Sequence, residues 1–306
     1  MRTLAEPAVR DLAWAIGSPG LLDPGFPAYS EPVLDDAFCT TELLRADTWL
    51  HGLDRDPAEL HAFLEKRPTH RLGHYFESLL EYWLKQAGAA ELRARLPVGD
   101  TGHRIGEFDF VFRKDDWGGS LHWEAAVKFY LQQSPAPEWN AFIGPNPRDR
   151  LSDKLHKLFH QQLKLGATTA GRAALGMATS PAPRAWVKGY LFFPAGTQPP
   201  SVPGISNHCL KGWWLRHGER PLPAHHAALR WKSLPRLGWL APARASAADL
   251  GTLLDTEHMH TVIARHFAHS HTPLLLAELA PDGDGTWHEI ARGFVVNPQW
   301  PQPSRP

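Results

Sequence analysis

Two carboxylates stand on one face of a predicted strand. In GEFDFVF (residues 106–112) side chains alternate between faces, so the three phenylalanines share one face while Glu107 and Asp109 share the other. Carboxylates on a strand otherwise built for burial cost free energy unless a cation or hydrogen-bond donors face them. The pattern therefore points to a site that handles cations or protons.

The next predicted strand, LHWEAAVKFYL (residues 121–131), carries Glu124 and Lys128 on one face. If the two strands pair as a hairpin, Asp109, Glu124 and Lys128 converge on a single patch. Paired carboxylates hold hard divalent cations such as Mg²⁺, and a neighbouring lysine stabilises charge that develops on a phosphate. Alternatively, alternating charges mark a solvated face and Glu124 with Lys128 forms an ordinary exposed pair.

A second group of basic residues surrounds the start of a predicted helix at 150–165. Arg150, Lys154 and Lys157 follow an i, i+4, i+7 spacing and so share one helix face, and Arg148 precedes them. Such a stripe can follow a phosphate backbone beside the carboxylates. A solvated helix face explains the same letters, because Asp149 and Asp153 interleave with them.

The elements that position these residues are predicted from hydrophobic periodicity. Apolar residues at three- and four-residue spacing indicate helices through most of residues 1–68. The best-patterned helix spans about 71–87, with Glu77 beside its apolar stripe. Further helices are predicted at 150–165 and within 246–268, and strands at 93–98, 104–113, 121–131, 186–193, 208–216 and 229–240, followed by a terminal hairpin in 273–296 with an Asp-Gly turn. This order favours an α/β or α+β core with an N-terminal helical cap.

Composition limits the class of protein. A chain of 306 residues with 43% hydrophobic residues can bury a large core, as one large domain or as a catalytic domain with an appendage. The two cysteines, Cys39 and Cys209, cannot build a disulfide framework or a cysteine-based zinc site, which favours a reducing, cytoplasmic compartment. No long uncharged apolar segment exists, so no membrane span is expected. The motifs of serine hydrolases, phosphate-loop NTPases and dinucleotide-binding enzymes are absent.

The net charge of zero hides an uneven distribution. Residues 1–100 carry a net charge of −6, whereas residues 184–244 carry nine basic residues and one acid. A basic middle suggests an anionic partner. The alternative is that acidic and basic segments pack on each other within one domain.

The arrangement resembles the core of the PD-(D/E)XK nuclease-like superfamily, and its resolvase-like branch in particular. The matching segments are the helix RLGHYFESLLEYWL with Glu77, the strand GEFDFVF with Asp109, and HWEAAVKFYLQ with Lys128. These motifs cover about residues 71–165, and the whole chain also resembles a bacterial family of unknown function placed near that superfamily. One position departs from the pattern, since Ala126 stands where the superfamily has its second acid, and Glu124 lies two residues earlier on the same face.

The resemblance implies an α/β fold with a restriction-endonuclease-like mixed sheet flanked by helices, as a helical cap (1–68) and a nuclease-like domain with a C-terminal β extension (69–306). It implies phosphodiester hydrolysis of a nucleic acid, most naturally DNA, with Mg²⁺ or Mn²⁺. The catalytic residues would be Asp109, Glu124, Lys128, Glu77 and Gln132, the metal ligands Asp109, Glu124, Glu77 and Glu107, and the nucleic-acid-binding residues Arg148, Arg150, Lys154 and Lys157.

Two other functions remain open. Ala126 favours an inactive nuclease-like module that binds nucleic acid or a protein. The other is a scaffold whose N-terminal helices recruit a protein partner without nucleic-acid contact.

Overall fold

The computed structural model describes residues 4–100, 103–177, 179–223, 229–283 and 285–302. The chain divides into two compact units. Unit 1 comprises Met1–Lys128, Ser152–Gly189 and Pro203–Cys209, and unit 2 comprises Phe129–Leu151, Tyr190–Val202 and Leu210–Pro306. The described strands form a ten-stranded mixed sheet in the order β1-β2-β3-β5-β6-β10-β9-β7, with β4 beside β3 and β8 beside β10. The predicted α/β class with a mixed sheet flanked by helices is confirmed.

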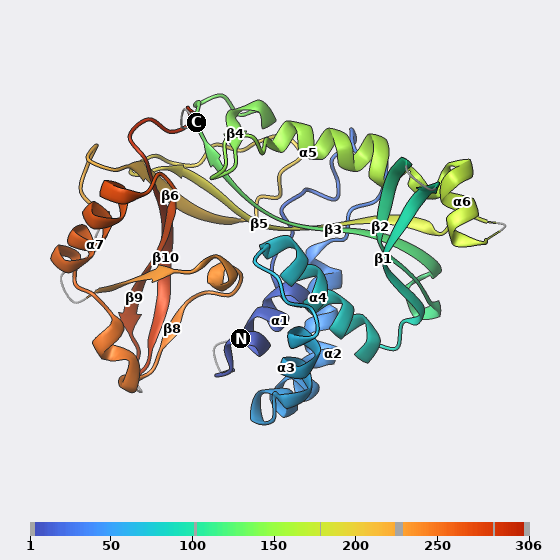
Figure 1. Cartoon of the computed structure of the whole chain (residues 1–306), viewed down its shortest axis with the longest axis horizontal. Coiled ribbons are helices and arrows are strands. Elements are labelled where there is room, and N and C mark those ends of the chain that lie inside the picture. Colours follow the sequence, from blue (N-terminus) through green and yellow to red (C-terminus); the bar gives the residue numbers. More distant parts are fainter. Residues whose placement is uncertain (1–3, 101–102, 178, 224–228, 284, 303–306) are drawn as a thin grey trace. The chain divides into compact units, whose positions relative to one another are not determined.

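Unit 1 holds most of the helices (Figure 1). Its elements are α1 (Pro7–Gly17), α2 (Asp36–Arg55), α3 (Ala58–Glu65), α4 (Leu72–Gln86), β1 (Ala90–Asp100), β2 (His103–Lys114), most of β3 (Gly119–Gln132), α5 (Leu151–Lys157), α6 (Thr169–Leu175) and the first part of β5 (Ala182–Pro194). Strands β1, β2 and β3 run antiparallel in sequence order. The hairpin predicted across 104–131 is therefore present.

Helix α4 forms because its apolar residues recur along one face. Leu72, Phe76, Leu79, Leu80 and Trp83 are all buried. The helix ends where Gly88 adopts a left-handed conformation (φ 80°) and its N–H bonds to the carbonyl of Lys85. This packing leaves the opposite face of α4 for polar side chains.

Unit 2 is richer in strands. It contains β4 (Phe142–Ile143), β6 (Leu210–Arg216), β7 (Arg230–Leu234), β8 (Arg244–Ala245), α7 (Thr256–His269), β9 (Leu274–Pro281) and β10 (Trp287–Val296). Strands β9 and β10 pair antiparallel, as predicted for the terminal hairpin. The strand expected across 229–240 was too long, because it ends at Leu234 before Pro235 and a 3₁₀ turn follows at Arg236–Trp239.

A close backbone approach in unit 1 depends on Gly189. This residue has φ 138°, and a Cβ at this position would collide with the backbone carbonyl of Lys128 on β3. Lys128 and Gly189 thus bring β3 and β5 together without a side chain between them.

We expect Gly189→Ala to lower the free energy of unfolding by about 3 kcal/mol or more, because the new methyl group forces the strands apart in a strained conformation. Gly52→Ala in α2, where the added Cβ meets nothing within 4 Å, serves as the control and should raise stability by up to about 1 kcal/mol. Denaturant unfolding of both variants measures the contrast. Equal stabilities would show that β3 and β5 tolerate separation.

Candidate active site

The site begins where β2 and β3 change their hydrogen-bonding pattern. Their backbone register runs from Lys114–Gly119 to Phe110–Trp123. At the next position the Ala125 N–H donates to Oδ2 of Asp109 (2.9 Å), and the Asp109 N–H donates to the carboxylate of Glu124. Side chains thus accept from N–H groups that would otherwise join the ladder, and the two acids end up side by side.

This change also alters which residues share a face. Strict alternation predicted that Phe108, Phe110 and Phe112 lie together. Instead, Phe108 packs edge-on against His122 (ring centroids 4.7 Å) and joins a cluster that includes Val111. The alternation is interrupted around Asp109, because the carboxylates occupy the place of backbone pairing there.

The two carboxyl groups form a proton-sharing pair. Asp109 and Glu124 are hydrogen-bonded to each other. Burial, and then repulsion by Glu124, raises the pKa of Asp109 well above its ordinary value, while burial raises the pKa of Glu124 to about 7. Each carboxyl group therefore holds a proton more tightly than it would in water.

Lys154, from α5, supplies a positive charge that acts on both members of this pair. Burial lowers the pKa of its ammonium group, the attraction of Asp109 opposes that shift, and repulsion by Lys128 adds to it. Lys154 Nζ donates to Gln162 Oε1 (2.9 Å), and Gln162 Nε2 donates to Glu124 Oε2 (2.5 Å). A continuous chain of polar contacts thus joins the helix to the carboxylates.

A π turn explains why Gln162 can reach Lys154. In a regular α-helix, residues eight apart are offset by about 80° around the axis. The segment Leu158–Gln162 is a π-helical turn, which follows α5 directly and reduces this offset. The sequence pattern predicted that Arg150, Lys154 and Lys157 share one face of a helix, but Arg150 precedes the helix. Lys154 faces the carboxylates, and α5 begins after Arg150.

Like Gln162, His122 is a residue of the site that the sequence patterns did not single out. Its Nε2 lies 2.8 Å from Oε1 of Glu124, and the side chain is buried. Burial lowers the pKa of His122 to about 4, so the ring is neutral at neutral pH. A neutral histidine that donates from Nε2 orients the Glu124 carboxylate without neutralising its charge.

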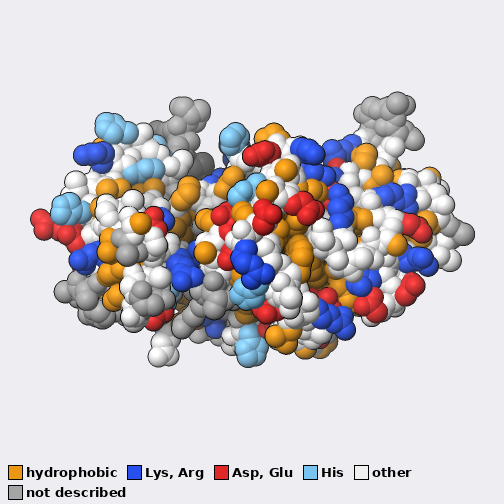
Figure 2. All heavy atoms as spheres, turned by 90° about the horizontal axis from the view of Figure 1, so that it is seen from below, with side chains coloured by type: hydrophobic (Ala, Val, Ile, Leu, Met, Phe, Trp, Pro, Cys, Tyr) orange, Lys and Arg blue, Asp and Glu red, His pale blue; other side chains and the backbone are white. Residues whose placement is uncertain are grey.

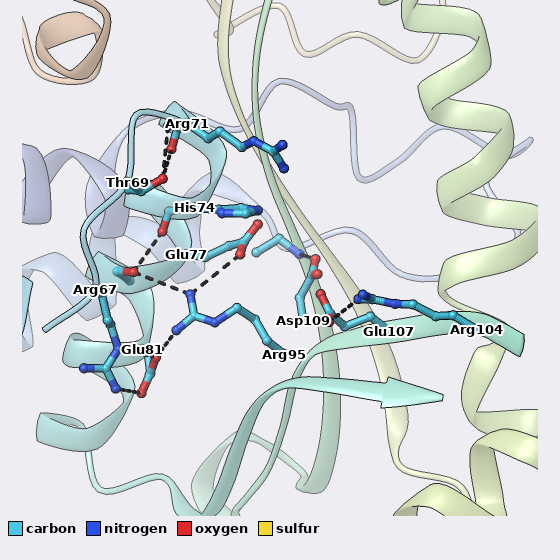
Figure 3. A network of polar contacts seen from close by, with 12 residues as sticks. Arg67, Thr69, Arg71, His74, Glu77, Glu81, Arg95, Arg104, Glu107 and Asp109 are labelled. Atoms are coloured by element: carbon cyan, nitrogen blue, oxygen red, sulfur yellow. Dashed lines mark hydrogen bonds and ion pairs between the residues drawn. The ribbon is translucent and has the colours of Figure 1, made fainter. Parts of the chain in front are cut away.

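Glu77 approaches from α4 (Figure 3). Burial, and then repulsion by Asp109, raises the pKa of Glu77 to about 8. Arg95 on β1 lies 3.9 Å from Glu77 and 2.8 Å from Glu81. Its strand neighbours Ala94 and Leu96 pair with the residues that flank Asp109, so Arg95 stands level with Asp109 across the strands. The Arg95 guanidinium thus partly offsets the negative charge of Glu77 and Glu81.

Lys128 and Glu107 lie at the border of the site. Lys128 is half-buried and close enough to Lys154 to lower its pKa. Glu107 makes an ion pair with Arg104, and its charge contributes to the raised pKa of Glu77. The carboxylate predicted as a spare metal ligand is therefore already engaged with a cation.

The remaining predicted residues lie outside this cluster. Arg148 and Arg150 are exposed and, with Gln132, belong to unit 2, whereas Lys157 is exposed on α5 of unit 1. Gln132 is buried at the end of β3, and its backbone carbonyl accepts from Trp214 Nε1 (2.9 Å). The structure thus unites Asp109, Glu124, Glu77, Lys128 and Lys154.

The donor atoms fit magnesium better than a transition metal. Within the described residues, no group of three or more histidine, cysteine, aspartate or glutamate side chains is arranged to hold a metal ion. Mg²⁺ commonly needs only one or two carboxylates, with waters and substrate phosphates completing its shell. Asp109 and Glu124 match this smaller requirement because both offer carboxylate oxygens.

Positively and negatively charged side chains are mixed on the surface that Figure 2 presents. Figure 2 shows lysine, arginine, aspartate and glutamate side chains interspersed across the middle of the face that it presents. On this face the unequal charge of the sequence segments has not produced a uniformly basic surface. Any polyanion binding there depends on local groups of cations.

The chain belongs to the family described as "Domain of unknown function (DUF1853)", whose match covers residues 10–296. No curated protein and no solved structure matches the chain. Among the described residues, no helix has both the length and the apolar character to cross a membrane.

The raised pKa values predict how stability depends on pH. The folded state binds a proton at Glu77 more tightly than the unfolded state does, because the pKa rises from 4.5 to about 8 on folding. Stability should therefore fall as pH rises through this interval, and Glu77→Gln should make the curve flatter. Thermal unfolding in EDTA between about pH 5 and pH 8 checks this, with Glu65→Gln on the exposed face of α3 as the control. Identical slopes in wild type and Glu77→Gln would contradict the assignment.

Proposed function

We propose that this protein hydrolyses phosphodiester bonds of a nucleic acid, with DNA as the expected substrate and Mg²⁺ or Mn²⁺ as cofactor. The observation that carries the proposal is the pairing of Asp109 and Glu124 beside Lys154. Two acids forced together, with one lysine alongside, form an environment that favours an additional cation.

The roles of the side chains follow from their positions. Asp109 and Glu124 would hold the metal, which supplies Lewis-acid polarisation of the phosphate and lowers the pKa of a bound water. Lys154 stabilises the negative charge that develops on the phosphate, and Lys128 adds to that field. Gln162 and His122 keep the Glu124 carboxylate in one orientation, so less reorganisation is needed when substrate arrives.

Resemblance to the PD-(D/E)XK nuclease-like superfamily supports the proposal. The chain follows the superfamily pattern in order, with Glu77 on a helix, Asp109 on a strand and Lys128 on the hairpin strand. From this resemblance we propose that the sheet is restriction-endonuclease-like and that the family is bacterial. Ala126 is the departure. Glu124 meets Asp109 although it lies two residues earlier, so the carboxylate missing at position 126 is replaced from a neighbouring position.

A second candidate function rests on the contacts of Glu124. Both of its oxygens are hydrogen-bonded, one to His122 and the other to Gln162. A carboxylate held in this way, with Lys154 nearby, could serve a module that binds nucleic acid or a protein without cutting. The two functions differ in one measurement, which is metal-dependent hydrolysis.

We also propose a reducing, cytoplasmic setting. Cys39 and Cys209 are both buried, and within the described residues neither is in a disulfide bond. Neither contributes to a cross-link that an oxidising compartment would favour.

Asp109→Asn and Lys154→Met should each reduce metal-dependent cleavage of DNA by about a hundredfold or more, because one removes a metal ligand and the other a transition-state charge. Cleavage of labelled DNA with Mg²⁺ and with Mn²⁺ measures the loss, and circular dichroism confirms folding.

Arg113→Ala is the matched control, since Arg113 is an exposed cation at the other end of β2 and should leave the rate unchanged. Undiminished cleavage by both site variants would refute the proposed catalytic site. Salt-dependent DNA binding without cleavage by the wild type would favour the binding module.

Mg²⁺ alone should raise the melting temperature of the wild type, because a ligand that binds only the folded state stabilises it. Glu124→Gln should abolish this response, because the variant lacks one of the two carboxylates that would hold the ion. Calorimetry with and without Mg²⁺ provides the measurement. A melting temperature that ignores Mg²⁺ in the wild type would argue against a metal site in the free protein.

A further inference from the structure

We infer that Arg71 and His74 form an edge of the site that binds backbone phosphates of a nucleic-acid strand on the α4 side of the carboxylates. We call this pair the α4 edge. The inference rests on the proposed function for the identity of the substrate, and it adds residues that the sequence patterns did not single out.

The electrostatics of the site create the need for such an edge. Asp109, Glu124 and Glu77 place three acidic groups together, and their ionised forms repel an approaching phosphodiester. Lys154 offsets this charge at the centre, and its ammonium is occupied with Gln162 and the carboxylates. A polyanion therefore needs further cations at the periphery.

Arg71 and His74 are placed to meet this need. Figure 3 shows Arg71, His74 and Glu77 extending from the same side of α4 toward the strand that bears Asp109. Their i, i+3, i+6 spacing keeps them close on the helix surface. Arg71 is the N-cap of α4, and both Arg71 and His74 are exposed.

Among the described residues, the side chains of Arg71 and His74 have no partner, unlike those of the neighbouring arginines. Arg67, Arg95 and Arg104 each pair with a carboxylate. Arg71 contacts Thr69 and Tyr75 through its backbone, and His74 contacts Ser78 through its carbonyl. The guanidinium and the imidazole are thus available to an external anion, and a guanidinium matches two phosphate oxygens at once.

The spacing along α4 sets the minimum length of the substrate. Arg71 lies about 9 Å along the helix axis from Glu77, at 1.5 Å per residue. A nucleic-acid strand rises about 3.4 Å per nucleotide, so Arg71 contacts a phosphate some two or three nucleotides from the one at the carboxylates. The α4 edge therefore contacts a polynucleotide strand, because a small phosphodiester or a mononucleotide held at the carboxylates does not reach Arg71.

The experiment measures binding without catalysis. Fluorescence anisotropy of a labelled single-stranded oligonucleotide is recorded in EDTA across a salt series, with wild type and the Arg71→Ala/His74→Ala double variant. We expect the double variant to bind about tenfold more weakly and its log–log salt slope to fall by about 1, because at least one phosphate contact is lost. Arg55→Ala, an exposed arginine at the end of α2, should match the wild type.

A second arm tests the dependence on substrate length. In Mg²⁺, wild type and the double variant should hydrolyse bis(p-nitrophenyl) phosphate equally, whereas cleavage of the oligonucleotide should be slower in the variant. Inorganic phosphate at the same phosphate concentration should not displace the bound oligonucleotide.

The outcomes separate the two proposals. Unchanged affinity and slope in the double variant, displacement by inorganic phosphate, or no binding by the wild type would overturn the α4 edge. Binding that requires the α4 edge, without hydrolysis by the wild type, would sustain it while refuting the proposed hydrolysis.

Discussion

The interaction on which the site depends is the exchange of hydrogen bonds between Asp109 and Glu124 at the end of the β2–β3 ladder. Each carboxylate accepts from a backbone N–H of the other strand, so the acids are held by the same groups that hold the strands. Burial raises the pKa of both carboxyl groups, and repulsion by Glu124 raises the pKa of Asp109 further. The remaining polar contacts of the site extend from this pair.

The helices on the two sides of this carboxylate pair contribute different kinds of side chain. On one side, α5 and its π turn deliver Lys154 and Gln162, which bond directly toward Glu124. On the other side, α4 delivers Glu77, whose charge is offset by Arg95. An acidic centre is thus flanked by cations that interact with groups of the chain, and Arg71 and His74 extend from α4 toward the strand of Asp109 (Figure 3).

Local patterns were sufficient for most elements of unit 1. The helix expected at 71–87 is α4, and the hairpin expected across 104–131 is β2 and β3, because strong periodicity and a glycine turn leave few alternatives. Prediction failed where a local exception intervened. Pro235 shortened β7, and the interruption at Asp109 moved Phe108 away from the face of the other phenylalanines.

By itself, the sequence determined that Asp109, Glu124 and Lys128 occur on one hairpin and that Glu77 occurs on the preceding helix, since these relations depend only on residue spacing. Only the tertiary structure decided which lysine faces the acids. A rule based on α-helical spacing cannot anticipate the π turn at Leu158–Gln162. Nor can it show that the attraction between the Lys154 ammonium and the buried carboxylates favours an inward-facing Lys154. Arg95 is brought to Glu77 by the register of β1 and β2. His122 is brought into the site by its packing against Glu124, which residue alternation along β3 did not single out.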